Sequence, residues 1–136
     1  CRFNRNRNKK DMIESKLTLD IITATLKGEK YEEQITRQLE HLEEVEYEHM
    51  DSGLLILIEY RKEAKEFWLT DSQLKETFGE SDHELSKVEL INEAENIQAE
   101  TLVHFTNGMI DRVEIWNQLG DYPEEDLKNW ELKPIQ

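Results

Sequence analysis

Cysteine is almost missing from this chain of 136 residues, because Cys1 is its single example. One thiol cannot form an internal disulfide bond, which favours a reducing compartment, so we expect a cytoplasmic protein. No run of about 18 apolar residues occurs, so the sequence predicts no membrane-spanning helix. A membrane-anchored lipoprotein is the alternative, since a cysteine at position 1 is where a lipid is attached after a signal peptide is removed.

Motifs for catalysis, cofactor binding and metal binding are also missing. The four histidines, His41, His49, His83 and His104, have neither the i, i+4 spacing nor the cysteine partners of a zinc site. The sequence contains no glycine-rich phosphate loop and no Gly-x-Ser-x-Gly motif around a nucleophile. Acidic residues are so numerous that a pair with catalytic spacing arises by chance. We therefore predict no enzyme activity, no cofactor and no metal, with a small hydrolase using an acidic pair as the least favoured alternative.

Glycine and proline are scarce, with five and two residues, while 37% of the chain is apolar and 35% is charged, which is typical of a folded protein. The length fits one domain, because dividing it would leave two small cores. Residues 1–11 combine five basic residues with one large apolar side chain, so they bury too little surface to offset the entropy of ordering. We predict a flexible basic tail over 1–11 and a single α+β domain over 12–136.

Acidic residues outnumber basic ones by 31 to 17, which gives a formal net charge of −14. Five of the basic residues lie in the first ten positions, so residues 11–136 hold 12 basic and 31 acidic residues, a charge of −19. Such a field repels nucleic acid and anionic lipid, and it accelerates encounter with a basic protein surface. We predict a protein partner, no nucleic acid, and no membrane unless Cys1 carries a lipid. The alternative is that the charge only keeps the protein soluble.

Two helices are predicted near the N-terminus. Apolar residues between Ser15 and Gly28 recur at helical spacing, although their alternation near the start also suits a strand. The segment from Tyr31 to Leu42 is the clearest helix, because its apolar residues recur every three or four positions and charged residues fill the other faces.

Two shorter helices are predicted later in the chain. Thr70 and Gln73 match a capping box, which predicts a helix over 71–78. Pro123 at the first helical position, followed by acidic residues, predicts another helix near 123–128.

Strand signals occupy the segments between the helices. Residues 44–49 alternate glutamate with less polar side chains, as a half-buried strand does, and turn residues follow over 50–53. Residues 54–58 are apolar at every position, which is typical of a central strand covered on both faces. Helices are expected on one face, and either more of this chain or another protein on the second. A further strand is predicted over 88–94.

The strongest hairpin signal joins 101–105 to 109–116 through the turn over 106–108, which contains Asn107 and Gly108. We expect a three-residue loop with Gly108 as the bulge residue, which puts Val103 on the core face, whereas a two-residue loop would shift the register by one. The opposite face would hold Leu102, His104, Ile110, Arg112, Glu114 and Trp116. The whole pattern predicts an α+β fold, with the two N-terminal helices packed on an antiparallel sheet of about four to five strands.

This hairpin and the turn after it also carry a family pattern. Its residues are Leu102, His104, Asn107, Gly108, Ile110, Val113, Glu114, Ile115 and Trp116, followed by Gly120 and Pro123. Together with the helices and hairpin over 17–60, the pattern resembles a group of small, mostly uncharacterised bacterial α+β proteins of the toxin-immunity type. The resemblance implies a protein that neutralises a secreted toxin by covering its active site.

We therefore favour an immunity or antitoxin-like protein that occludes the active site of a basic toxin, such as a nuclease whose basic groove fits acidic side chains. A structural or adaptor domain, with or without a lipid on Cys1, is the alternative. The candidate partner-binding residues are Glu44, Glu46, Glu48, Arg112, Glu114, Trp116, Asp121, Glu124 and Glu125. The sequence identifies neither the partner nor the oligomeric state.

Overall fold

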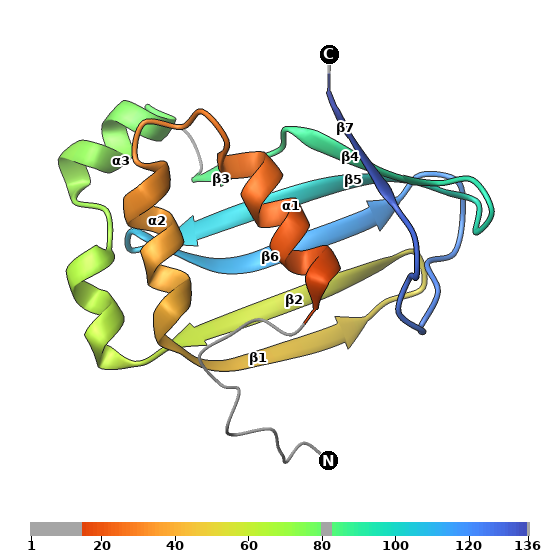
Figure 1. The fold of residues 1–136 in the computed structure, drawn as a ribbon, viewed down its shortest axis with the longest axis horizontal. Helices are drawn as coiled ribbons and strands as arrows, with labels where there is room; N and C mark the ends of the chain where they lie inside the picture. Colours follow the sequence, from red (N-terminus) through yellow and green to blue (C-terminus); the bar gives the residue numbers. More distant parts are fainter. Residues whose placement is uncertain (1–14, 80–82, 136) are drawn as a thin grey trace.

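An antiparallel sheet with helices against one face makes up the structure (Figure 1). The computed structural model describes residues 15–79 and 83–135. The strands are β1 (Leu42–His49), β2 (Gly53–Tyr60), β3 (Glu84–Leu85), β4 (Val88–Asn92), β5 (Ile97–Thr106), β6 (Met109–Asn117) and β7 (Glu131–Pro134). The helical segments are α1 (Lys16–Leu26), α2 (Glu32–Gln38), the 3-10 helices η2 (Leu39–His41) and η3 (Lys62–Phe67), and α3 (Asp71–Phe78). The predicted α+β class is confirmed, whereas the predicted tail lies outside the described residues.

Both N-terminal helices form, and α2 is shorter than predicted. Ser15 caps α1 by accepting a hydrogen bond from the backbone N–H of Thr18 (3.2 Å), and Ile21 is fully buried on its inner side. The helical alternative for this segment is therefore confirmed. The α2 helix ends at Gln38, and the 3-10 helix η2 connects it to β1, whose first residue is Leu42.

The capping box of α3 is present, but the last predicted helix is not. The Thr70 N–H donates to Gln73 Oε1 (2.9 Å), and the Gln73 N–H donates to Thr70 Oγ1 (3.1 Å). The helix predicted near 123–128 is wrong, because these residues form bends and irregular chain. The Tyr122 side chain is buried just before them and its N–H donates to the Asp51 carbonyl (2.9 Å). These contacts hold the segment against the end of the sheet.

The sheet is larger than predicted, because the described residues form seven strands where about four to five were expected. The strand order is β1-β2-β6-β5-β4-β7, and β3 pairs with the same strand as β4, namely β5. Sequence analysis missed β3 and β7, which are two and four residues long and therefore show no periodicity. The helical layer is not formed by the N-terminal helices alone, because η3 and α3 lie between β2 and β3 in the chain and η3 packs against α2.

The β5–β6 hairpin forms with a two-residue loop instead of the predicted three-residue loop. Its strands pair on either side of Asn107 and Gly108, whose φ angles are 52° and 87°. A β-bulge follows within the hairpin and shifts the register by one residue, so Val103 pairs with Val113 and the core face is the predicted one. Ile110 is the exception, because it is fully buried in the core instead of lying on the opposite face.

One face of the sheet carries no helix of the described residues, and we call it the open face. Along β2, Leu54, Ile56 and Ile58 are buried on the helix side, whereas Leu55 and Leu57 are half-buried on the open face. Within the described residues, the chain therefore covers only one face of this apolar strand.

Candidate functional site: the open face of the sheet

Cross-strand pairing sets side chains of the open face in rows. The first row contains, from β1 to β3, Glu46, Leu57, Arg112, His104 and Glu84. The second row contains, from β1 to β5, Glu48, Leu55, Glu114 and Leu102. Each row begins with an exposed glutamate on the edge strand β1 and continues over a leucine of β2 to charged side chains of β6. The face therefore combines a charged edge on β1 with leucines of β2 and charged side chains of β6.

Four half-buried apolar side chains occupy the middle, and we call them the apolar strip. They are Leu55, Leu57, Leu102 and Trp116. They come from three neighbouring strands, β2, β6 and β5, and Glu114 of β6 lies between Leu55 and Leu102 in the second row. A group of apolar side chains that the fold leaves partly in water is a common feature of surfaces that bind another protein.

Trp116 is held in place by packing against Gly53 and by a hydrogen bond to Glu114. It pairs across the strands with Gly53, and a Cβ atom at Gly53 would lie 2.5 Å from Cε3 of the Trp116 ring. Glycine at this position therefore lets the ring pack directly on the β2 backbone. The Trp116 Nε1–H also donates to Glu114 Oε1 (2.7 Å), so both the ring and its polar edge have fixed partners.

Glu114 is the centre of a polar cluster on the open face. Its Oε2 lies 2.8 Å from His104 Nε2 and 2.9 Å from Arg112 Nε. These two N–H groups are not aligned with the oxygen, so the contacts act through charge more than as directed hydrogen bonds, and His104 contributes a charge only when protonated. Glu84 extends the cluster, with Oε1 3.4 Å from His104 Nδ1.

The surroundings of Glu114 favour its ionised form. Burial by itself raises the pKa of this carboxyl group, but the hydrogen bond from Trp116 and the charges of His104 and Arg112 outweigh burial. The pKa of Glu114 therefore lies below its usual range. The ionised carboxylate attracts His104 and Arg112 and accepts the hydrogen bond from Trp116, so it holds these three side chains together.

Acidic side chains surround the apolar strip. They include Glu44, Glu46, Glu48, Glu59, Glu84, Glu89 and Glu100. Glu44 lies directly opposite Glu59, and Glu89 lies directly opposite Glu100, with Lys133 on the other side of Glu89. Like charges at opposite positions destabilise a sheet. The opposed acids of β1 and β2 therefore lower the stability of the fold.

The open face brings together six of the nine predicted partner-binding residues. Those on β1 are exposed, and those on β6 are half-buried: Glu44, Glu46, Glu48, Arg112, Glu114 and Trp116. The other three lie outside the strands, in the segment between β6 and β7: Asp121, Glu124 and Glu125. Glu125 lines a cavity on the helix side of the sheet.

Leu55 and Leu57 of the apolar strip were not among the predicted partner-binding residues. Glu59 and Glu100, two of the acids around the strip, were not among them either. An all-apolar strand does not show which half of its residues faces outward, and only the register of its neighbours decides this. The charge alternation of β5, in contrast, was a signal that Glu100 faces away from the core.

The described residues contain no group of three or more His, Cys, Asp or Glu side chains placed to hold a metal ion. None of the helices in these parts of the chain is long and apolar enough to cross a membrane. Comparisons with protein-family models, with curated proteins and with solved structures returned no significant match.

Proposed function

We propose that this protein is a binding module that holds a basic protein against the open face of its sheet. The observation that carries the proposal is the apolar strip, which lies beside the exposed glutamates of β1 with no helix of the described residues above it. Protein interfaces combine apolar and aromatic side chains at the centre with polar groups at the rim. The matching partner has an apolar patch bordered by lysine and arginine.

Trp116 is the residue expected to contribute most to the binding free energy. Tryptophan is enriched among the few interface residues whose truncation strongly weakens binding. Its ring already rests on Gly53 and its Nε1–H already donates to Glu114, so binding orders it little further.

The resemblance of the last hairpin to toxin-immunity proteins supports a specific partner, namely a basic bacterial toxin. The carboxylates of Glu44, Glu46 and Glu48 would occupy the positions of substrate phosphates in the groove of a nuclease-type toxin and block its active site. In this role the protein is an immunity protein or antitoxin, acts in the cytoplasm and needs no catalytic residue.

The test measures binding to the product of the neighbouring reading frame, together with growth on co-expression. The wild-type chain is expected to bind it and to suppress its toxicity. Reversing three charges on β1, by Glu44→Lys, Glu46→Lys and Glu48→Lys, is expected to weaken binding at least about ten-fold, because favourable charge contacts become repulsive.

The matched control reverses three exposed glutamates on α2 and η3, by Glu33→Lys, Glu63→Lys and Glu66→Lys. This variant changes the net charge equally and is expected to bind within about three-fold of wild type. Equal losses of binding affinity in the two triple variants would show that the partner does not bind through the open face. Absence of binding and of protection by the wild-type chain would remove the immunity function.

Trp116→Ala tests the centre of the interface. We expect the dissociation constant to rise about 30-fold or more, equivalent to about 2 kcal/mol, because a rigid aromatic anchor is lost. The variant is to be compared at a temperature at which circular dichroism shows it fully folded. A change of less than about three-fold in a folded variant would contradict a central role for this ring.

A further inference from the structure

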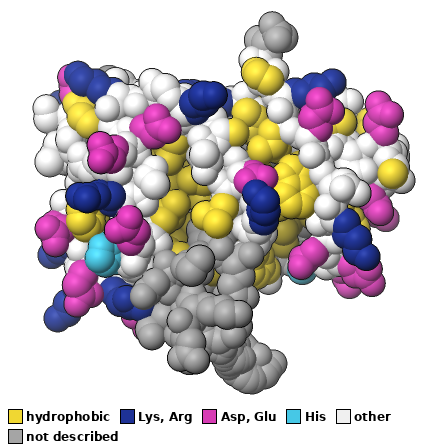
Figure 2. All heavy atoms as spheres, in the orientation of Figure 1, with side chains coloured by type: hydrophobic (Ala, Val, Ile, Leu, Met, Phe, Trp, Pro, Cys, Tyr) yellow, Lys and Arg dark blue, Asp and Glu magenta, His cyan; other side chains and the backbone are white. Residues whose placement is uncertain are grey.

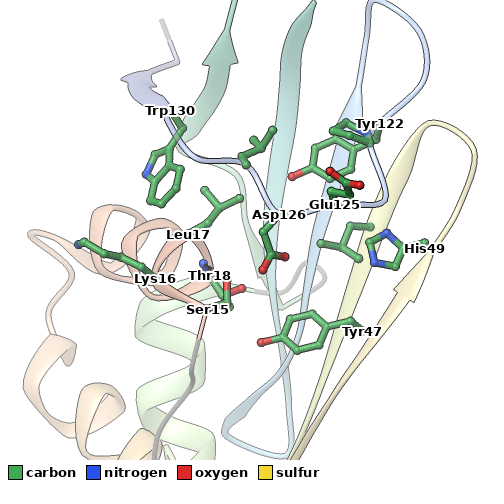
Figure 3. Close-up of a pocket in the computed structure, with 13 residues that line it drawn as sticks. Ser15, Lys16, Leu17, Thr18, Tyr47, His49, Tyr122, Glu125, Asp126 and Trp130 are labelled. Carbon is green, nitrogen blue, oxygen red and sulfur yellow. Dashed lines mark hydrogen bonds between the residues drawn. The ribbon is translucent and has the colours of Figure 1, made fainter. Parts of the chain in front are cut away.

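A cavity of about 460 Å³ lies on the helix side of the sheet, away from the open face (Figure 3). Its walls come from the N-terminus of α1, from β1 and β2 beside their turn, and from the segment that follows Tyr122. Leu17 and Leu54 line it and are buried members of the core, so this part of the wall is already formed by the fold. The volume lies within the range of small-molecule sites.

Aromatic side chains make up much of the wall. Tyr122 is buried, Trp130 is half-buried, and Tyr47 is 41% exposed. The Trp130 Nε1–H donates to Asp20 Oδ2 (3.0 Å), which fixes the ring at one end of the cavity. In Figure 2, which views this side of the molecule, hydrophobic side chains gather near the middle with charged side chains around them. Aromatic faces next to acidic groups attract cations.

Carboxylates supply the charge of the cavity. Glu125 and Asp126 both line it, and Figure 3 shows the Asp126 side chain directed into the space between α1 and β1. Burial first, and then the charge of Asp126, raise the pKa of Tyr122 to about 12, so its phenol stays neutral. Lys16 is a cation at the rim, but its Nζ lies 3.2 Å from Asp20 Oδ1, and this carboxylate offsets its charge.

The N-terminus of α1 is the feature that would favour an anion instead. Its N–H groups are partly satisfied already, because Ser15 Oγ accepts from the Thr18 N–H and the Ser15 carbonyl accepts from the Leu19 N–H. In the view of Figure 3 the Asp126 carboxylate is drawn next to Ser15 and Thr18 at this helix end, where it provides a negative charge. His49 is the other basic side chain of the lining, and Glu125 and Asp126 outnumber it, so the balance of the lining favours a positive ligand.

We infer that this cavity binds a small organic cation, an ammonium group attached to an apolar body. The ammonium group lies between Asp126 and the aromatic rings, and the apolar body packs against Leu17, Leu54 and Leu127. The net charge of −14 draws such a ligand toward the protein. The inference goes beyond the proposed function and does not depend on it, because the open face lies on the other side of the sheet.

The test uses three probes with nearly the same body and different charge: phenethylammonium, 2-phenylethanol and 3-phenylpropionate. Each is titrated into the full chain while the indole N–H resonances and the heat of binding are recorded. Phenethylammonium is expected to bind at least about ten-fold more tightly than the other two and to shift the Trp130 resonance.

Variants of the lining locate the site. Asp126→Asn is expected to weaken phenethylammonium binding about five-fold or more, and Tyr47→Ser about three-fold, because the first removes the charge and the second removes an aromatic face. Glu63→Gln on η3 is the control, since it neutralises an exposed acid outside the cavity, and it should leave binding unchanged. The triple reversal on β1 should leave the Trp130 shift in place, which separates this site from the proposed protein interface.

Four results would overturn the inference. Equal binding of the three probes would show an apolar cleft without charge selectivity, and preference for 3-phenylpropionate would show an anion site at the start of α1. No shift of Trp130 up to the solubility limit of phenethylammonium would show that the cavity does not take this class of ligand. Binding only after removal of residues 1–11, which hold five basic residues, would assign the site to the chain's own N-terminal segment.

Discussion

Glu59 and Glu44 face each other on β2 and β1, and their repulsion gives a prediction about stability. Glu59→Lys replaces a like-charge pair by an opposite-charge pair and should raise the free energy of unfolding by about 0.2–1 kcal/mol. Urea denaturation at low ionic strength measures the effect. The gain should shrink in 1 M NaCl, where the Debye length falls to about 3 Å.

Glu63→Lys is the control for this prediction, because Glu63 is exposed on η3 and has no place in the strand pairing. It should change the free energy of unfolding less than Glu59→Lys does. If the acidic surround serves binding, Glu59→Lys should also weaken the complex with a basic partner while it stabilises the free protein. A variant that is both less stable and better bound would contradict this interpretation.

Glu114→Gln is expected to lower the free energy of unfolding at neutral pH by about 1–3 kcal/mol, because His104 and Arg112 lose a charged partner in a half-buried position. Because the pKa of Glu114 is lowered on folding, its carboxylate stabilises the fold above the unfolded-state pKa, and this stabilisation is lost as the pH falls through the folded-state pKa. The difference between wild type and variant should therefore narrow between about pH 5 and pH 3.

Thermal or urea unfolding across this pH range measures the difference. Glu46→Gln, on the exposed edge strand, is the control. Its free energy of unfolding should change with pH in parallel with that of the wild type. A Glu114→Gln curve that also stays parallel down to pH 3 would show that the ion pairs of Glu114 do not stabilise the fold.

At the scale of elements, Gln38 is the polar link between α2 and the β5–β6 hairpin. It is fully buried, its Nε2 donates to the carbonyls of Phe67 (3.0 Å) and Gly108 (2.7 Å), and its Oε1 accepts from the Ile110 N–H (3.1 Å). Gln38→Leu leaves these backbone groups without partners in the core and should lower the free energy of unfolding by about 2–4 kcal/mol.

Equilibrium denaturation tests this link, and Glu33→Leu serves as its control because it makes the same kind of change on the exposed side of α2. The control should shift the free energy of unfolding by no more than about 0.5 kcal/mol. Similar small effects from both variants would show that water or relaxed neighbours replace the bonds of Gln38.

The elements that the sequence predicted correctly are those with local signals. The α3 capping box needs only Thr70 and Gln73, and the last hairpin needs only Asn107 and Gly108. The elements that it missed depend on distant partners. β3 and β7 exist because β5 and β4 offer free backbone groups, and the segment after Tyr122 is not helical because Asp51 and Asn117 hold its start by backbone and side-chain hydrogen bonds.

The part of the candidate site that could be predicted is the part that follows from the alternation of residues along single strands. The glutamates of β1 were expected on one face, as were the alternating residues of β6, and all of them except Ile110 lie as expected. In the structure the glutamates of β1 and the polar residues of β6 lie on the same face of the sheet, with Leu55 and Leu57 between them. This arrangement depends on β2 lying between β1 and β6, and no local sequence pattern predicts that strand order. The bulge that buries Ile110 was hidden for the same reason.

At the scale of the whole molecule, the charge of −14 predicts how association responds to salt. With a basic partner, the association rate constant should fall about ten-fold or more between 50 mM and 500 mM NaCl, while the dissociation rate constant changes much less. Stopped-flow mixing or surface-based kinetics measures both constants. An association rate that does not change with salt would mean that the acidic surface does not steer the partner.

The position of β1 at the edge of the sheet affects self-association of this protein. Its outer backbone groups have no strand beside them among the described residues, and such margins invite a second molecule to extend the sheet. Two copies joined there about a twofold axis perpendicular to the sheet would set the carboxylates of Glu44, Glu46 and Glu48 against the same three groups of the other copy. The repulsion between these like charges opposes self-association at this edge of the sheet.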